Sequence, residues 1–124
     1  MPNYDDVTAY KAEVAISKYH LVKPGSTEGT ATIASSATDA LLGVTTDIDA
    51  NAGETVDVAY SDIGLVQAGG TIAAGDPLTS DANGAAVKAA PAAGANNRIV
   101  GFAKNAGVAG DIINVFISPG QIQG

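Results

Sequence analysis

The sequence contains no cysteine and no tryptophan, and it has a single histidine, His20. Without cysteine the chain has no disulfide, no thiolate metal site, no iron–sulfur cluster and no cysteine nucleophile. A Ser-His-Asp triad would have to be built around His20, with Ser17 or Ser61 and Asp62 as partners, but the Gly-x-Ser-x-Gly nucleophile elbow is absent. We therefore expect His20 to be structural and the protein not to be an enzyme.

Positive charge is scarce, because six Lys and Arg residues stand against thirteen Asp and Glu, for a net charge of -7. This balance excludes the basic surface expected of a nucleic-acid binder or of a protein that binds anionic membranes. The sequence also lacks an apolar run of about 18 residues and a basic segment ahead of an apolar stretch, so it predicts neither a membrane span nor an export signal. The acidic surplus itself favours solubility.

Large apolar side chains are few. The 124 residues include 24 Ala but only 28 Leu, Ile, Val and Phe in total, with two Phe and four Tyr. Small side chains bury little area each, so a single domain of this composition should fold but would gain stability from a partner surface. Self-association is the first expectation.

The carboxylates and glycines do not form a recognisable ligand site. Asp47 and Asp49 do not begin a calcium loop that a Glu closes at its twelfth position, and Asp76 and Asp81 flank a turn. The P-loop-like glycines at 64–71 have Gly70 in place of the lysine that contacts phosphates. We interpret the acids as solvated turn residues and expect no metal and no cofactor.

Alternating apolar residues predict strands. Val56, Val58 and Tyr60 share one face of a strand over 55–60, and Ile113, Val115 and Ile117 share one face near the end. Residues 78–80 and 85–89 read as a hairpin around the turn 81–84, which contains Asn and Gly. The Ala-rich stretch 34–42 favours a loop with one short turn over a helix. The pattern predicts an all-β fold, either a small barrel or a sandwich.

An internal repeat constrains this fold. Residues 41–44, LLGV, match residues 99–102, IVGF, and residues 53–58, GETVDV, match residues 110–115, GDIINV. Two copies of a strand, loop, Gly-acid turn and strand predict two similar hairpin units packed into one barrel.

The first 30 residues differ in composition from the rest and are expected to form an N-terminal arm, followed by a barrel over 31–118 and a frayed tail over 119–124. The arm contains three of the six basic residues, three of the four tyrosines (Tyr4, Tyr10 and Tyr19) and His20. Tyrosine is enriched where proteins meet proteins, which favours a contact role. The alternative is that residues 14–22 are the first strand and that Tyr19 packs on the barrel.

Residues 72–87, IAAGDPLTSDANGAAV, together with the repeat, resemble a tailed-phage family of small capsid decoration, or cement, proteins. The resemblance covers about residues 30–117. It implies a β-tulip-like barrel, often trimeric, that binds the outside of the major capsid protein lattice and stabilises the head without doing chemistry. It also implies a protein made in the host cytoplasm and located on the virion. This chain departs from the family pattern in its longer, Tyr-bearing N-terminus.

From this resemblance and the arm's composition we predict that Tyr4, Tyr10, Lys11 and Tyr19 contact the capsid, and that deleting residues 1–12 abolishes the contact while the barrel stays folded. The alternative function is a carbohydrate- or protein-binding module of a phage tail or fibre, which would also be all-β, acidic and Gly-rich. Sugar sites usually need an aromatic platform, and the chain lacks Trp.

Overall fold

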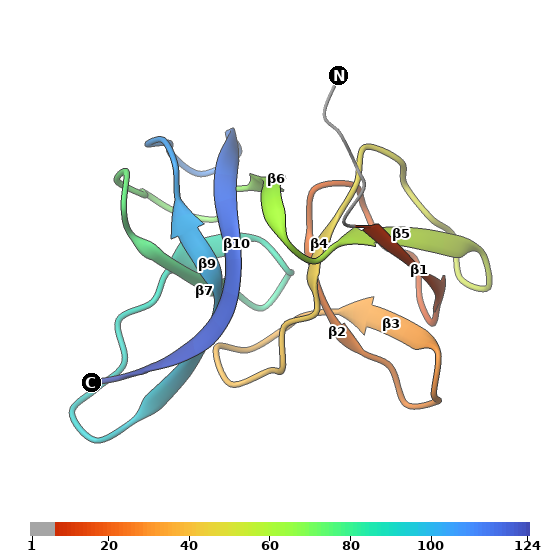
Figure 1. The fold of residues 1–124 in the computed structure, drawn as a ribbon, viewed down its shortest axis with the longest axis horizontal. Coiled ribbons are helices and arrows are strands. Elements are labelled where there is room, and N and C mark those ends of the chain that lie inside the picture. Colours follow the sequence, from red (N-terminus) through yellow and green to blue (C-terminus); the bar gives the residue numbers. More distant parts are fainter. Residues whose placement is uncertain (1–6) are drawn as a thin grey trace.

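The computed structural model describes residues 7–124 and confirms the all-β fold. Its ten strands are β1 (Val7–Ala12), β2 (Leu21–Pro24), β3 (Thr30–Ile33), β4 (Gly43–Thr45), β5 (Thr55–Ala59), β6 (Asp62–Gln67), β7 (Pro77–Ser80), β8 (Ala86–Lys88), β9 (Asn96–Ala103) and β10 (Ile112–Gln123). We call β1–β5 the first unit and β6–β10 the second unit. Figure 1 shows them side by side, joined where β5 leads into β6.

The two units have the same strand order. The first unit is a closed barrel whose strands follow one another in the order β1, β5, β4, β2 and β3, with β3 again next to β1. The second unit has the order β6, β10, β9, β7 and β8, so its strands correspond one for one to those of the first unit. The first barrel closes through parallel pairing of Ala12 with Ala31, and the second unit has a parallel bridge between Ala68 and Ala86 in the corresponding place. The repeat therefore extends beyond the expected hairpins and covers all five strands of each unit.

The expected arm and tail supply strands to these units. Residues 7–12 and 21–24, inside the expected arm 1–30, form β1 and β2 of the closed barrel. β10 continues to Gln123 and pairs with β9 through the expected tail 119–124. These segments form strands because their backbones pair with segments distant in sequence, as Val7 pairs with Ala59. Composition does not reveal such pairing.

Several local predictions are confirmed. β7 and β8 form the predicted hairpin, with Asp81 Oδ1 accepting the backbone N–H groups of Asn83 and Ala85 at 2.8 and 3.0 Å. Residues 34–42 form a loop. The side chains of Ile113, Val115 and Ile117 are buried, as are those of Val56 and Val58. Tyr60 was expected on the buried face but follows the end of β5 and is 44% exposed.

Three turns repeat one hydrogen-bonding pattern. At 51–54, 73–76 and 108–111 the third residue is a glycine with positive φ, and the carboxylate of the fourth accepts the backbone N–H of the first at 2.7, 2.8 and 2.9 Å. Side chains that bond their own turn backbone in this way fix its geometry. These carboxylates, those of Glu54, Asp76 and Asp111, are turn-forming residues.

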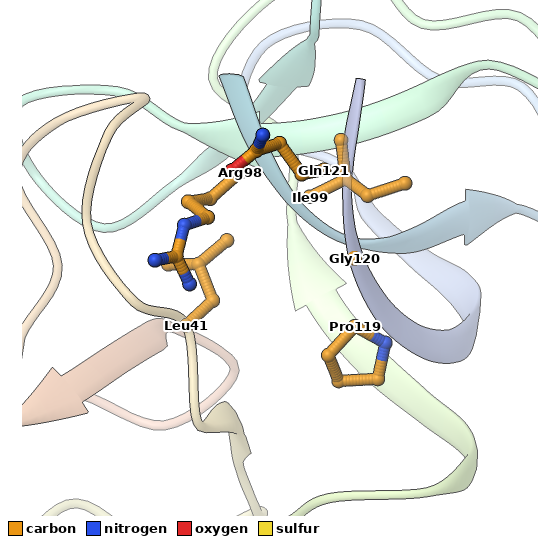
Figure 2. A pocket seen from close by; sticks show the side chains of 6 residues that line it. All are labelled: Leu41, Arg98, Ile99, Pro119, Gly120 and Gln121. Carbon is orange, nitrogen blue, oxygen red and sulfur yellow. The ribbon is translucent and has the colours of Figure 1, made fainter. Parts of the chain in front are cut away.

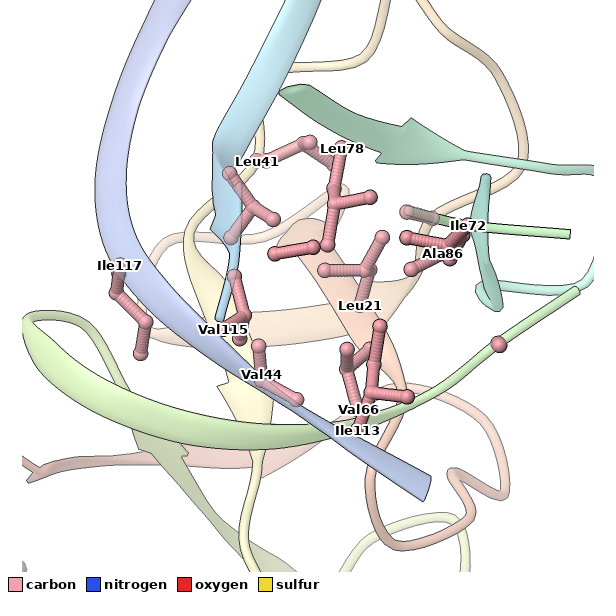
Figure 3. Close-up of a cluster of buried hydrophobic side chains, with 14 of the residues drawn as sticks. Leu21, Leu41, Val44, Val66, Ile72, Leu78, Ala86, Ile113, Val115 and Ile117 are labelled. Atoms are coloured by element: carbon pink, nitrogen blue, oxygen red, sulfur yellow. The ribbon is translucent and has the colours of Figure 1, made fainter. Parts of the chain in front are cut away.

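The apolar core has two parts. One part fills the first barrel and consists of Ala12, Ile16, Val22, Ala31, Ala50, Val56 and Val58. The other part, drawn in Figure 3, fills the second unit and extends across the junction to side chains of the first unit, including Leu21, Leu41 and Val44. In β2, Leu21 and Val22 belong to different clusters, because successive strand residues point to opposite faces. The first unit therefore packs the outer face of its sheet against the interior of the second.

Close backbone approach requires glycine at two equivalent positions, Gly43 and Gly101. A Cβ at Gly101 would meet the Phe116 carbonyl oxygen at 1.8 Å, and a Cβ at Gly43 would meet that of Ala59 at 2.0 Å. Real side chains do not approach a backbone oxygen so closely, so a larger residue there forces the strands apart.

Gly101→Ala should lower the free energy of unfolding by about 1–3 kcal/mol, because β9 must move away from β10. Chemical denaturation followed by circular dichroism measures this change. Gly120→Ala is the matched control on β10, where an added Cβ would have no neighbour nearer than 3.9 Å. Equal stability of the two variants would contradict the argument.

Candidate functional site

Two of the predicted contact residues, Tyr10 and Lys11, lie on β1 and point to opposite sides. Tyr10 is half-buried and packs against the core of the first barrel. Lys11 is exposed and pairs with Thr55 of β5 on one side and with Thr30 of β3 on the other. Of these two residues, only Lys11 has an exposed side chain that a partner can contact. Tyr4 lies outside the described residues.

Tyr19 lies in the segment before β2, within the stretch 14–22 that the alternative prediction made a strand. Its φ is 61°, in the left-handed region that non-glycine residues seldom adopt. Backbone bonds hold it there: its N–H donates to the Thr46 carbonyl at 3.3 Å, and its carbonyl accepts the Gln67 N–H at 2.8 Å. The Lys18 ammonium lies 5.8 Å from its ring centroid. Tyr19 is thus a half-buried residue at the junction of the two units.

A pocket beside Lys11 is lined by the end of β1 and by the β2–β3 turn. Its polar centre is Glu13, whose Oε2 accepts the Ser26 N–H at 2.7 Å and the Ser26 hydroxyl at 2.6 Å. The Ser26 hydroxyl and then its N–H hold the pKa of Glu13 below its ordinary value, against a smaller opposing effect of burial. The Glu13 carboxylate therefore stays ionised and anchors this turn. It lies just after β1, the strand that carries Lys11.

A second pocket lies between the 34–42 loop and the strands β9 and β10 (Figure 2). Arg98 extends from β9 beside Leu41, and Pro119, Gly120 and Gln121 form the β10 side. The backbone N–H of Arg98 donates to the Ala37 carbonyl at 2.7 Å, which ties the loop to the second unit.

Asp39 organises this loop. Its Oδ2 accepts the N–H groups of Ser35 and Ser36 at 2.8 and 3.0 Å and lies 3.2 Å from the Lys23 ammonium. Burial raises the pKa of Asp39. The Ser35 N–H, the Lys23 ammonium and the Ser36 N–H together lower it by more than burial raises it, so the pKa lies below its ordinary value.

Two of the residues considered for a catalytic triad, His20 and Ser17, have structural partners. His20 Nδ1 lies 2.7 Å from the Lys18 carbonyl oxygen, and Ser17 uses its carbonyl to accept the Thr45 hydroxyl. The P-loop-like segment begins at Gly64 inside β6, so the first part of it is a strand and not a loop. Within residues 7–124, three or more His, Asp or Glu side chains do not gather into a metal-binding group. Helices long and apolar enough to span a membrane are likewise absent from residues 7–124.

The prediction missed the exposed apolar side chains of the second unit. Ile63, Phe102, Ile112 and Phe116 are 38–45% exposed on β6, β9 and β10. The signal was present in the sequence, because alternation that turns Ile113, Val115 and Ile117 inward turns Ile112 and Phe116 outward.

These features describe an all-β protein with exposed sheet faces and turns. Residues 4–117 match the model of a family described as phage cement protein, and the chain belongs to that family. It is a family of structural phage proteins and not of enzymes. No curated protein sequence matches the chain.

Among solved structures, the fold is similar to the N base of the head fiber protein gp8.5 of bacteriophage phi29. The TM-score is 0.68 at 20% sequence identity, and the match covers 95% of this chain and 98% of that one. At this identity the likeness establishes the fold.

Stability should depend on pH through Asp39. Its folded-state pKa lies below the ordinary value of 3.8, so its contribution is complete above that pH and is lost as the pH falls through the lower folded value. Asp39→Asn should cost about 1 kcal/mol at neutral pH and flatten the fall in unfolding free energy in acid.

Denaturation curves of both proteins across this pH range measure the effect. Asp57→Asn removes the same charge from an exposed position of β5 and serves as the control for general charge effects. An Asp39→Asn profile parallel to that of the wild type at all pH values would contradict the assignment.

Proposed function

We propose that this protein is a capsid decoration, or cement, protein that binds the outside of the major capsid protein lattice and stabilises the phage head. The observation that carries the proposal is the match of residues 4–117 to the phage cement protein family. The all-β fold, the exposed apolar residues and the acidic composition support it, because they suit a soluble protein that acts by surface contact.

We propose further that the chain acts as a homotrimer located on the virion exterior after synthesis in the host cytoplasm. Contacts that are weak in one subunit add up in a trimer, and a capsid lattice presents their binding sites repeatedly. The Ala-rich composition supports association, because the core gains apolar contacts when chains pack together. The net charge of -7 argues against nucleic acid as the partner.

Tyr4, Tyr10, Lys11 and Tyr19 remain the proposed capsid-contacting residues, with different weights. Lys11 is exposed at a pocket, and Tyr19 is held by backbone bonds in a fixed position, so both present defined groups to a partner. Tyr10 packs on the core, and its substitution would disturb folding. Deletion of residues 1–12 is also unsuitable as a test, because it removes β1 from the closed barrel. The prediction that the barrel stays folded after this deletion does not fit the structure.

Lys11→Gln combined with Tyr19→Asn should weaken binding to undecorated capsids by at least about tenfold, because each removes a contact group without a core cavity. Asn tolerates the positive φ of position 19. Co-sedimentation with capsids of the same phage measures binding, and circular dichroism checks the fold. The control is Lys88→Gln, which removes an exposed cation from the second unit. Binding equal to that of the wild type would remove these residues from the contact.

A tail or fibre module that binds carbohydrate or protein is the second candidate, favoured by the fold similarity to the base of a head fibre. Quantitative mass spectrometry of purified virions separates the two. A copy number near that of the major capsid protein is expected for a cement protein, and a few copies per particle would favour the fibre module.

A further inference from the structure

The second unit exposes a row of four apolar side chains across its sheet. In the pairing register Ile63 of β6 lies beside Phe116 of β10, Phe116 beside Phe102 of β9, and Phe102 beside Pro77 of β7. Ile63, Phe116 and Phe102 are 38%, 45% and 41% exposed, and both phenylalanines of the chain belong to the row. We call these four residues the outer row. Exposed aromatic side chains grouped in this way mark an interaction surface.

The same row exists in the first unit, where it is buried. Val7 of β1 lies beside Ala59 of β5, Ala59 beside Val44 of β4, and Val44 beside Leu21 of β2. The strand order makes these four residues the counterparts of Ile63, Phe116, Phe102 and Pro77. Leu21 and Val44 are completely buried, Ala59 is 4% exposed, and Val7 packs against the same cluster. The first-unit row is thus an occupied contact surface.

The occupant of the first-unit row is another five-stranded unit of the same kind. The cluster around Leu21, Val44 and Ala59 is completed by residues of the second unit, among them Val66, Ile72 and Leu78 (Figure 3). The first unit therefore offers its outer sheet face, and the second unit offers the side chains of its interior. Such a contact between unlike surfaces leaves one copy of the sheet face uncovered, and this is the outer row.

Charge also favours the second unit as the place where copies meet. Residues 1–60 contain nine acidic and three basic residues, whereas residues 61–124 contain four acidic and three basic. Two chains of net charge -7 repel least where acids and bases are nearly balanced. Lys104, whose ammonium lies 5.8 Å from the Phe116 ring centroid, adds a positive charge next to the row.

We infer that the outer row is the surface through which one chain binds a second copy of itself. The inference deepens the proposed homotrimer by naming its contact surface, and it rests on that proposal. A second chain is the occupant because the half of the chain that carries the row has nearly balanced charges, so two copies can approach there, and because the first-unit row shows that a unit of this fold packs on such a row. At three of the four positions the uncovered row has the larger side chain, two Phe and one Ile in place of two Val and one Ala, which gives it more apolar area to bury.

The test is the mass of the full chain in solution, measured by light scattering and sedimentation over a range of concentrations. The wild type should give a mass several times the 12.2 kDa of one chain. The double variant Phe102→Thr/Phe116→Thr should shift to the single-chain mass, or raise the dissociation constant at least about tenfold. Thr suits an exposed strand position, so the fold should persist, and circular dichroism checks it.

Val108→Thr and Ile48→Thr are the controls, because both residues are exposed, at 56% and 68%, and lie outside the row. They should leave the mass unchanged. A double variant that keeps the oligomeric mass would overturn the assignment of this surface while leaving the homotrimer in place. A wild type that is monomeric even in concentrated samples would overturn both. Capsid co-sedimentation of the same proteins tests the proposed function separately, since capsid binding does not require association in free solution.

Discussion

The packing of the first unit's outer sheet face onto the interior of the second unit is the contact on which the rest of the structure depends. Leu21, Val44 and Ala59 leave the water only through this contact, and they complete a core that the second unit's own side chains leave unfinished. None of these side chains is aromatic, so the stabilisation comes from close fit across the junction and not from a few aromatic groups. The two units are therefore one cooperative body built from a repeated strand plan.

The repeat produces a molecule whose two halves have unequal surroundings. The same strand order and equivalent close approaches at Gly43 and Gly101 show that the backbone plan is shared. The side chains have diverged where the surroundings differ, with Ala59 in the buried row and Phe116 at the same place in the uncovered one. The acidic residues have likewise collected in the first half. The first half therefore carries most of the acidic residues, and the second half carries the uncovered apolar row.

The sequence predicted what depends on neighbouring residues. Alternation placed Val56, Val58 and Ile113 correctly in the interior, and Asn83 and Gly84 marked the hairpin turn that the structure contains. The repeat was visible as short sequence matches, but its full extent was not. The remaining corresponding strands of the two units share their geometry but not their amino-acid sequence. The parallel closure of β1 on β3 was equally hidden, since it joins segments that no local pattern connects.

The candidate site shows the same division. Composition predicted Tyr10, Lys11 and Tyr19 alike as contact residues, and only the three-dimensional arrangement shows that Tyr10 points into the core and that Tyr19 is fixed at a junction. The barrel closure around β1 also affects how the chain can fold during synthesis. Val7 pairs with Ala59, so the first barrel cannot close until the ribosome has released residue 59. The face of that barrel then stays uncovered until β10 has emerged, which makes the nascent chain dependent on its last strand for a finished surface.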